Sequence, residues 1–484
     1  MKKKKILMVA AELTPIAKAG GLGDVIGALP KALADLGCEV KIILPYYGFI
    51  NDKTYKIKKI IDKVSFISEG VRQSISLWET ILPGSSVKII LIKHRYFSGK
   101  NIYEGGRVQL DKKYTRMPND IKRFAFFSHA SLEAVKSLDW QPDVIHCHDW
   151  HVAVITDYLK GLYQNDPFFQ NVKTLYTIHN LANQGIAEQN VTDLAKLSSL
   201  LPSIKKDLED GQLNFMQQGI ANGNLINTVS PTYAKEILTK EYGAGLEKLL
   251  KTRKNDLSGI INGIDVDFFN PQKDKFIKYN YSSGSLQKKK LNKLYLQKEL
   301  GLEQDQNKLM IGLVSRLVWQ KGIELVTEKF ADLDCQFVFL GTGQKETEEH
   351  LLTLAKKFPG KFSAQIKFDV GLAQRIYAGA DMFLMPSLFE PCGLGQLIAM
   401  RYGTVPVVRT TGGLADTVDS SVGFSFSKFN SNVLYETLSK AIDLYHSQPK
   451  AWNKLIQKGM KKDFSWHKSA KEYIKLYNKL AKIK

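Results

Sequence analysis

Cysteine is scarce in this sequence, and the few cysteines that it has are far apart. They number four among 484 residues: Cys38, Cys147, Cys335 and Cys392. Because no two of them form a C-x-x-C pair, the sequence indicates neither a disulfide framework nor a thiolate zinc site. This cysteine usage suits a reducing compartment, so we expect a cytoplasmic protein.

Long apolar runs are also missing. None approaches the roughly 20 apolar residues that a membrane-spanning helix needs. The lysines at the start, followed by apolar residues 6–11, imitate a signal peptide. That run is too short and Glu12 ends it, so it predicts a first buried strand instead. We therefore expect no membrane partner.

Acidic residues are in the minority, since 68 Lys and Arg stand against 48 Asp and Glu, a formal charge of +20. Such an excess can indicate nucleic acid, a membrane surface or an anionic small substrate. The lysines are mostly scattered, and no basic patch alternates with aromatic residues as in proteins that bind single strands. We expect no nucleic-acid partner, and ordinary solvated surface with lysine in place of arginine can account for much of the excess.

What the sequence does contain is a repeated alternation of strands, loops and helices. Its 484 residues exceed one ordinary domain, so two domains are expected. Residues 6–44 predict a strand, a glycine loop, a helix and a strand, which is the opening of a nucleotide-binding domain. A second such series opens at residues 309–315, after a join around residues 258–265. The glycines match neither G-x-G-x-x-G nor a P-loop. The predicted fold class is α/β.

The loop after residue 315 carries two cations at a strand's carboxyl end. Arg316 and Lys321 are five residues apart, and a helix is predicted from Ile323. Arginine can grip a phosphate through two nitrogens, and lysine adds a point charge. These residues predict a site for a phosphate-bearing ligand.

A second strand-to-helix turn carries a carboxylate. Residues 381–385 predict a buried strand, Glu390 follows it, and residues 396–402 predict a helix. In a doubly wound sheet, ligands bind outside the carboxyl ends of the strands, and a helix N-terminus suits phosphate. The turn could therefore hold an anion and place Glu390 against sugar hydroxyls. Alternatively, Glu390 simply caps the helix.

The first predicted domain has a glycine loop and a histidine at a strand end. Gly20 and Gly21 would let the backbone approach a ligand, with Lys18 as a mobile charge, although a plain turn is equally open. His179 ends a strand, where it could bind a substrate hydroxyl or be a satisfied buried histidine. Both alternatives stay open for each feature.

Three further histidines cluster at the end of another predicted strand. They are His146, His148 and His151, and they resemble a metal site. Carboxylate partners and a complete ligand set are not evident. The pattern therefore favours a hydrogen-bonding wall at the strand's carboxyl end over a metal site.

Taken together, these motifs resemble those of the bacterial glycogen synthases and plant starch synthases. Each motif alone is weak, but the set occurs in order along nearly the whole chain and is highly specific. The matching segments are residues 18–22 (K-x-G-G-L), 148–150, 178–180, 262–265, 315–317, 320–322, 389–394, 411–416 and 463–466.

The resemblance implies two Rossmann-like domains that face each other across a deep cleft, the GT-B architecture. Residues 1–258 would form the acceptor-side domain and residues 259–458 the domain that binds the nucleotide sugar. Residues 459–484 would form helices that return to the first domain. The implied reaction is retaining transfer of glucose from ADP-glucose to the non-reducing-end 4-hydroxyl of an α-1,4-glucan, glycogen or starch-like, with release of ADP. No metal and no other cofactor is implied.

The resemblance also assigns roles to residues. Arg316 and Lys321 would neutralise the departing diphosphate. Glu390 would hold the glucose hydroxyls, and His179 would contact the sugar from the opposite domain; these four are the expected catalytic residues. Further contacts with ADP-glucose are expected from Lys18, Gly20, Gly21, Asn262, Gln320, Phe368, Cys392, Gly393 and Leu394. Contacts with the acceptor or the sugar are expected from Asp24, Asp149 and Asn180.

Two residues depart from the family's pattern, and other functions stay open. Gly395 stands where many relatives have threonine, and Phe368 where some have tyrosine, so one hydroxyl contact is lost at each. A glucan-binding protein without catalysis would lack Arg316, Lys321 or Glu390, and all three are present. A transferase that uses UDP-glucose or makes sucrose-like products, and a phosphorylase with lysine-bound pyridoxal phosphate, are the remaining alternatives.

Overall fold

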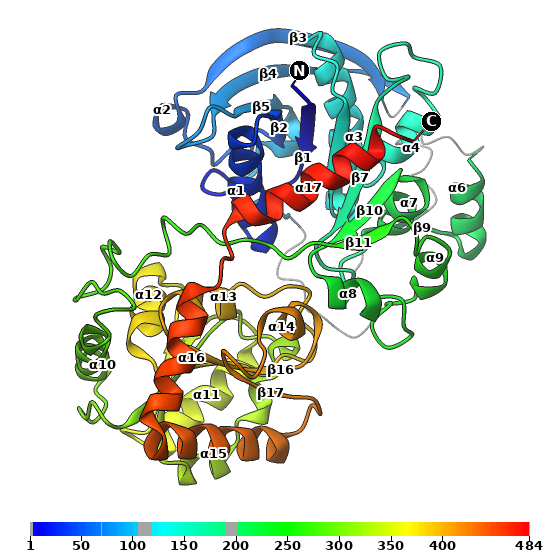
Figure 1. The fold of residues 1–484 in the computed structure, drawn as a ribbon. Coiled ribbons are helices and arrows are strands. Elements are labelled where there is room, and N and C mark those ends of the chain that lie inside the picture. Colours follow the sequence, from blue (N-terminus) through cyan, green and yellow to red (C-terminus); the bar gives the residue numbers. More distant parts are fainter. Residues whose placement is uncertain (1–2, 69, 105–117, 189–200, 484) are drawn as a thin grey trace. The chain divides into compact units, whose positions relative to one another are not determined.

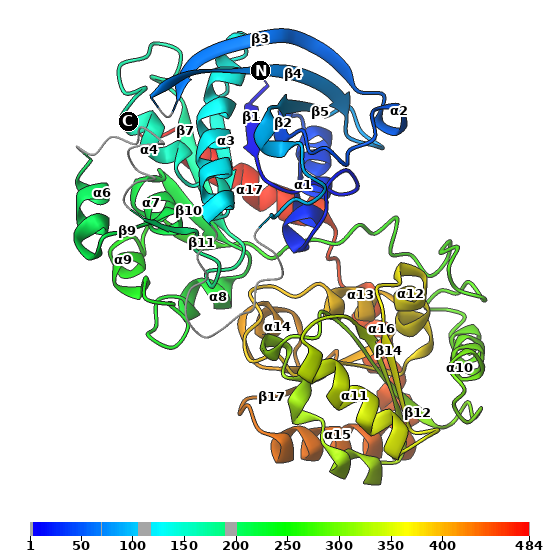
Figure 2. The same ribbon diagram turned by 180° about the vertical axis from the view of Figure 1, so that it is seen from behind.

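The structure, a computed structural model, describes residues 3–68, 70–104, 118–188 and 201–483. Its contacts divide the chain into two compact units (Figures 1 and 2). Both units contain parallel sheets with helices, so the predicted α/β class is confirmed. The boundaries expected after residues 258 and 458 stay predictions for the functional domains. The first unit comprises Met1–Val229, Ala234–Gly263 and Trp466–Lys484, and the second comprises Ser230–Tyr233 and Ile264–Ser465.

The main sheet of the first unit reverses its strand order at β1. In the described residues it has nine strands in the order β11-β10-β7-β6-β1-β2-β5-β4-β3. The β3–β4 and β4–β5 pairs are antiparallel and the other pairs are parallel. The strands are β1 (Lys5–Val9), β2 (Glu39–Pro45), β3 (Lys58–Ser68), β4 (Val71–Ile81), β5 (Lys88–Lys93), β6 (Val144–His148), β7 (Lys173–Ile178), β10 (Leu225–Thr228) and β11 (Leu257–Gly259); β8 (Ile186–Glu188) and β9 (Gln212–Asn214) form a separate pair.

The helices of the first unit follow the apolar spacing of their sequences. In α1, the buried residues Leu22, Val25, Ile26, Leu29 and Leu33 recur at helical intervals and form one face. The helices and 3-10 turns are α1 (Gly21–Asp35), α2 (Asp52–Tyr55), η1 (Arg95–Phe97), α3 (Pro118–Ser137), η2 (Trp150–Val152), α4 (Ile155–Lys160), α6 (Pro202–Asp207), η3 (Leu208–Asp210), α7 (Phe215–Asn222), α9 (Glu247–Thr252) and α17 (Trp466–Leu480). Helix α8 (Pro231–Glu236) begins in the second unit and ends in the first.

The last helix of the chain, α17, belongs to the first unit, where it packs against α1 and β7. In Figure 1 it is the red helix that crosses in front of β7. Its buried face includes Tyr473 and Tyr477, and Lys4 donates from Nζ to the Tyr477 carbonyl at 3.0 Å. The preceding helix belongs to the second unit, and the first unit includes the chain again from Trp466 onward.

The second unit is an open sheet whose neighbouring strands all run parallel. The order β14-β13-β12-β15-β16-β17 corresponds to 3-2-1-4-5-6 in chain order within this unit, the Rossmann arrangement. The order reverses between β12 and β15, and ligands of such sheets bind where the order reverses. The strands are β12 (Leu309–Val314), β13 (Cys335–Gly341), β14 (Phe362–Ile366), β15 (Met382–Met385), β16 (Val405–Arg409) and β17 (Phe424–Phe426).

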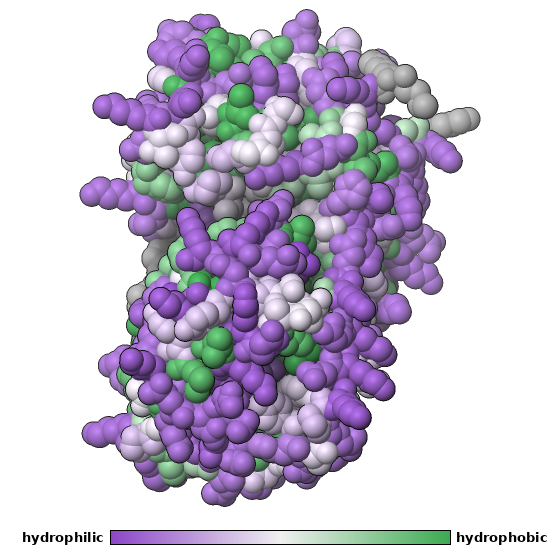
Figure 3. Space-filling view, turned by 60° about the vertical axis from the view of Figure 1, so that its left-hand side comes forward, coloured by the Kyte–Doolittle hydropathy of each residue, from purple (hydrophilic) through white to green (hydrophobic). Residues whose placement is uncertain are grey.

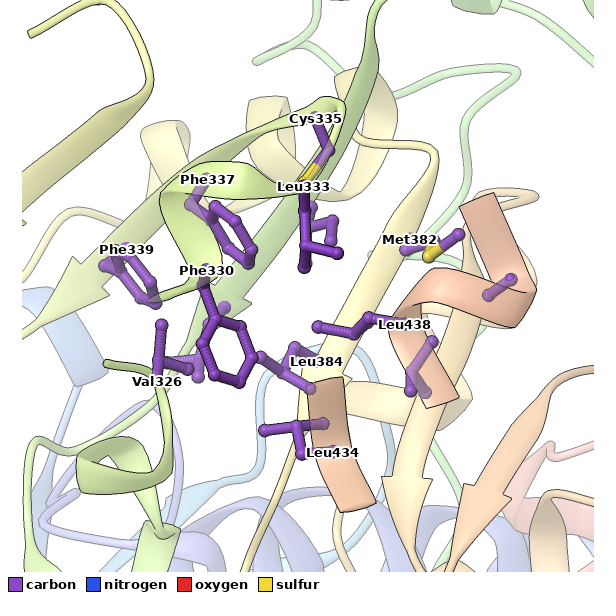
Figure 4. Close-up of a cluster of buried hydrophobic side chains, with 14 of the residues drawn as sticks. Val326, Phe330, Leu333, Cys335, Phe337, Phe339, Met382, Leu384, Leu434 and Leu438 are labelled. Carbon is purple, nitrogen blue, oxygen red and sulfur yellow. The ribbon is translucent and has the colours of Figure 1, made fainter. Parts of the chain in front are cut away.

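The second unit buries apolar side chains on both faces of its sheet. Met382 and Leu384 of β15 join one cluster, together with Phe330 and Leu434 (Figure 4), whereas Phe383 joins another. Successive side chains of a strand point to opposite faces of the sheet, so the apolar residues of β15 contribute to the core on both faces. The helices and 3-10 turns are α10 (Gln287–Glu299), η4 (Trp319–Lys321), η5 (Ile323–Leu325), η6 (Glu328–Asp332), α11 (Lys345–Lys357), α12 (Val370–Gly379), α13 (Gly395–Arg401), α14 (Gly412–Thr417), α15 (Ser431–Ser447) and α16 (Pro449–Lys461).

The helix predicted from Ile323 is wrong. The chain forms the short 3-10 turns η5 and η6 there, separated by Val326 and Thr327 in extended conformations. Val326 and Phe330 are fully buried. Burial of these side chains, together with two β-branched residues in succession, outweighs the local helical spacing.

The face of the molecule drawn in Figure 3 is largely polar. Figure 3 shows hydrophilic side chains over most of the face drawn, with small separate apolar patches. Within the described residues, every helix falls short of the length and apolarity that a bilayer crossing requires.

Candidate active site

In the second unit, the loops that follow β12 and β15 are hydrogen-bonded to each other. Leu388 donates its backbone N–H to the Gln320 carbonyl at 2.9 Å, and Gln320 Nε2 donates to the Phe389 carbonyl at 3.0 Å. Gly322 has a φ of +65°, and a Cβ there would lie 2.2 Å from the Pro386 carbonyl oxygen. Only glycine permits this approach, so the sequence at residue 322 lets the two loops meet.

The meeting of these loops creates an ion pair. Lys321 Nζ lies 2.6 Å from Glu390 Oε2, and their side chains are only 16% and 8% exposed. Ser387 Oγ also donates to Glu390 Oε2, at 3.0 Å. Glu390 therefore stands in a charge pair instead of capping α13, whose N-cap is Leu394 without a side-chain cap bond. The capping alternative is wrong.

Arg316 lies on the same loop as Lys321, with its side chain exposed. Among the described residues its guanidinium has no hydrogen-bond or ion-pair partner. The backbone beside it is held, because Leu317 donates to the Thr342 carbonyl at 2.9 Å. A Cβ on Gly343 would lie 2.0 Å from the Leu317 carbonyl. The loop is thus positioned by the turn after β13, while the guanidinium remains available for an anion.

Two supports of Glu390 were not predicted from the sequence. Arg409, at the end of β16, is buried and donates from Nη1 to the Leu388 carbonyl. Gly413 donates its N–H to the Glu390 carbonyl at 3.1 Å, and a Cβ on Gly412 would lie 2.0 Å from that oxygen. The pair Gly412 and Gly413 after β16 indicates close backbone packing in the sequence. The loop against which it packs, which contains Glu390, is not indicated by any local pattern.

The other expected donor-site residues of this unit differ in exposure. Phe368 lies beyond the end of β14 and is 83% exposed, so its ring face is accessible. Cys392 is buried, and Gln396 Nε2 donates to the carbonyls of Cys392 and Gly393, each at 3.0 Å. Leu394 is partly exposed at the start of α13. Gln320 is buried, and its side-chain amide is engaged in the hydrogen bond to the Phe389 carbonyl.

In the first unit, the glycine loop after β1 is held by Glu12, which the sequence did not single out. This buried carboxylate accepts the backbone N–H groups of Ala19 at 2.9 Å and Gly20 at 2.6 Å. Tyr103 donates its hydroxyl to the same carboxylate at 2.7 Å. The N–H of Gly20 is therefore already used. A Cβ on Gly21 would meet no atom within 4 Å, which leaves open space beside the loop.

Lys18 and Asp24 form a partly exposed pair at this loop. Their Nζ and Oδ1 atoms lie 2.6 Å apart. Thr14 Oγ1 also donates to Asp24 Oδ1, at 3.2 Å. Both charges remain accessible, and a pair at this exposure contributes little to stability.

Asp149 holds the strand end that carries His179. Its Oδ1 accepts the backbone N–H of His179 at 2.7 Å, and its own backbone has a φ of +61°, which is rare for a residue with a side chain. The Asn180 side chain accepts the N–H of Ala182 at 3.1 Å. Asn262, by contrast, has a buried Oδ1 without a partner in the described part of the chain.

The predicted hydrogen-bonding wall is confirmed for His146 and His148, but not for His151, whose ring packs on Tyr103 and Trp150 and whose buried Nδ1 has no hydrogen-bond partner among the described residues. His146 contacts the Tyr477 hydroxyl at 2.9 Å and Thr177 Oγ1 at 2.7 Å, and His148 Nδ1 lies 3.0 Å from His179 Nε2. Burial lowers the pKa of His179 to about 3. No group of three or more His, Cys, Asp or Glu within the described residues is arranged to hold a metal ion.

The Asp149 carboxyl predicts a pH dependence of stability. Burial raises its pKa from 3.8 to about 7, although the N–H groups of His179 and Asn180 favour ionisation. Well below pH 3.8 the Asp149 carboxyl is protonated in both the folded and the unfolded form. As pH rises to 7 the unfolded form ionises first, so this group progressively destabilises the fold, by about 1.4 kcal/mol per pH unit.

Asp149→Asn should remove that contribution, because an amide oxygen still accepts the His179 N–H. The measurement is the difference in melting temperature between the variant and the parent at pH 4 and pH 7.5. We expect the variant to gain relative stability at the higher pH. An unchanged difference across this range would contradict the assigned pKa.

Comparison with known proteins identifies the family. Residues 5–252 match the family described as the starch synthase catalytic domain, and residues 297–462 match glycosyl transferases group 1. Proteins named glycogen synthase from Thermosipho melanesiensis and Thermotoga maritima are each 43% identical to this chain. The alignments cover 98% of both chains for the first and 99% of both for the second.

Solved structures agree with these matches. The catalytic domain of starch synthase IV from Arabidopsis thaliana, bound to ADP and acarbose, superposes with a TM-score of 0.90 at 33% identity, over 100% of both chains. Sucrose-phosphate synthase from Thermosynechococcus elongatus reaches a TM-score of 0.59 at 16% identity over 99% of both chains, which shows the fold alone. The chain therefore belongs to the glycogen synthase and starch synthase family of glycosyltransferases, with the GT-B fold of two Rossmann-like units.

Proposed function

We propose that the protein transfers glucose from ADP-glucose to the non-reducing-end 4-hydroxyl of an α-1,4-glucan, with retention at the anomeric carbon and release of ADP. The observation that carries the proposal is the Lys321–Glu390 pair, which joins the two loops where the strand order of the second unit reverses. A relative bound to ADP and acarbose supports a nucleotide and a glucan-like ligand in this family.

The reaction requires that negative charge be stabilised on the departing diphosphate and positive charge on the glucosyl ring. When the bond between the anomeric carbon and the diphosphate oxygen breaks, ADP gains negative charge and the glucosyl ring becomes cationic. Arg316 and Lys321 would neutralise the diphosphate, and Glu390 would hold glucose hydroxyls and favour the cationic ring. Preorganised charges of this kind act without reorganising when the reaction occurs.

The remaining residues would surround the two substrates. His179 would contact the glucosyl group, and Lys18 with Gly20 and Gly21 would complete the donor site. Residues 1–258 would serve the acceptor, 259–458 the nucleotide sugar and 459–484 the return to the first domain. Additional donor contacts are proposed for Asn262, Gln320, Phe368, Cys392, Gly393 and Leu394, and sugar or acceptor contacts for Asp24, Asp149 and Asn180. We place the reaction in the cytoplasm, which suits four free cysteines.

A panel of donors and acceptors tests this function. Purified protein is given ADP-glucose or UDP-glucose, with glycogen, a short maltooligosaccharide or no acceptor. Glucose should be incorporated from ADP-glucose into both glucans without added metal. Because the acceptor-free arm measures hydrolysis of the donor, it separates transfer from donor breakdown. Activity restricted to UDP-glucose, or glucan breakdown that requires phosphate, would contradict the proposal.

A further inference from the structure

His148, one histidine of the wall, has unusual hydrogen-bond contacts. It ends β6 and is fully buried, and its Nδ1 lies 3.0 Å from Nε2 of His179. Its other ring nitrogen, Nε2, is buried and has no hydrogen-bond partner among the described residues. The ring therefore has one polar contact, and that contact is with a proposed catalytic residue.

The plane of the His148 ring is fixed by its neighbour. The rings of His146 and His148 lie 3.9 Å apart between centroids. His146 is itself held at both nitrogens, by the Tyr477 hydroxyl of α17 and by Thr177 of β7. Helix α17 thus holds the His146 ring, and the His146 ring packs against His148.

The two rings of the His148–His179 contact share a single proton between them. Burial, with contributions from His146 and His179, lowers the pKa of His148 well below its usual range, and burial lowers that of His179 to about 3. Both rings are neutral near pH 7, so one nitrogen of the contact donates and the other accepts.

Two pairs of tautomers satisfy this hydrogen bond, and they differ in whether His148 Nε2 carries a proton or a lone pair. If His179 Nε2 donates, His148 must carry its proton on Nε2, which leaves an N–H buried without an acceptor. If His148 Nδ1 donates, only a lone pair is buried at His148 Nε2. Buried N–H groups without acceptors are rare in folded proteins, and orphaned acceptors somewhat less so. The second arrangement is therefore favoured.

We propose that His148 is a positioning residue that donates from Nδ1 to His179 Nε2 and thereby makes His179 present Nδ1–H on its accessible side. His179 is only partly buried, and its Nδ1 has no hydrogen-bond partner in the described part of the chain. A neutral N–H donor there suits a sugar hydroxyl oxygen. This last step rests on the proposed function, whereas the tautomer of His179 does not.

Nitrogen NMR of the substrate-free protein labelled in its nine histidines reads the tautomers directly. We expect His148 and His179 both to carry the proton on Nδ1 at pH 7. Assignment uses the resonances that disappear in His148→Asn and in His179→Gln. A proton on Nε2 of either ring would overturn the proposal, whether or not the protein transfers glucose.

Matched substitutions test the effect on catalysis. His148→Asn places an amide N–H near the position of Nδ1, whereas His148→Asp places an acceptor there and demands the opposite tautomer of His179. We expect the asparagine variant to keep kcat within about threefold and the aspartate variant to lose about tenfold or more, with little change in the KM for glucan.

The control is His446→Asn, which removes an exposed histidine of α15 and should leave kcat and the NMR signals of the pair unchanged. Equal losses in the asparagine and aspartate variants of His148 would overturn donation by His148. Should no variant and not even the parent protein transfer glucose, the proposed function fails, while the tautomer measurement still decides this inference.

Discussion

Lys321→Ala is expected to lower kcat with ADP-glucose by about a hundred- to a thousand-fold, the usual cost of removing one preorganised group at a centre of developing charge. Lys321 lies 2.6 Å from Glu390 and is largely shielded from water. In such a site charges interact more strongly than in bulk water. Initial rates at saturating donor and acceptor measure the effect.

The controls for this variant separate chemistry from folding. Removing Lys321 leaves the buried Glu390 without its cation, so the melting temperature must be compared as well. Lys329→Ala changes an exposed lysine of the same unit and should leave the rate unchanged. Binding of glycogen, measured by co-sedimentation, should survive in both variants. A Lys321→Ala enzyme as fast as the parent would defeat the role of this residue.

Lys293→Ala is expected to destabilise the second unit by about 3–5 kcal/mol, the range for breaking a buried ion pair. The Lys293 side chain is 1% exposed, and its Nζ lies 2.7 Å from Asp381 Oδ2. It also donates to the Lys308 carbonyl at 3.0 Å and to the Tyr445 hydroxyl at 3.1 Å. Without it, Asp381 keeps a mostly buried negative charge whose carboxylate, within the described residues, accepts a hydrogen bond only from the N–H of Met310, at 2.9 Å.

Hydrogen exchange at β12 and β15, together with thermal melting, measures this loss, since a chain of two units need not unfold in one step. The matched control is Lys290→Ala, an exposed lysine of the same helix, which should change stability by less than about 0.5 kcal/mol. If Lys293→Ala unfolds no more easily than Lys290→Ala, the buried pair does not stabilise this unit.

Much of the local structure was predictable because it depends on nearby residues. The apolar run of β1 and the helical spacing of α1 both appeared where their sequences indicated. Arg316, Lys321 and Glu390 lie in the segments that follow β12 and β15, where the sequence placed them. The helix expected after Gly322 failed, since burial of Val326 and Phe330 favoured short turns there, and residue spacing alone does not report burial.

The sequence by itself determined the α/β class, the two strand-helix series and the loops that carry the charged residues, because hydrophobic periodicity and turn residues act over a few positions. Only the tertiary structure decided which loops meet. Lys321 and Glu390 are 69 positions apart, and His146 and Tyr477 are 331 apart. Such contacts follow from strand order and packing, in which each group finds its partner by burial and hydrogen bonding across the fold, and no local pattern specifies that partner.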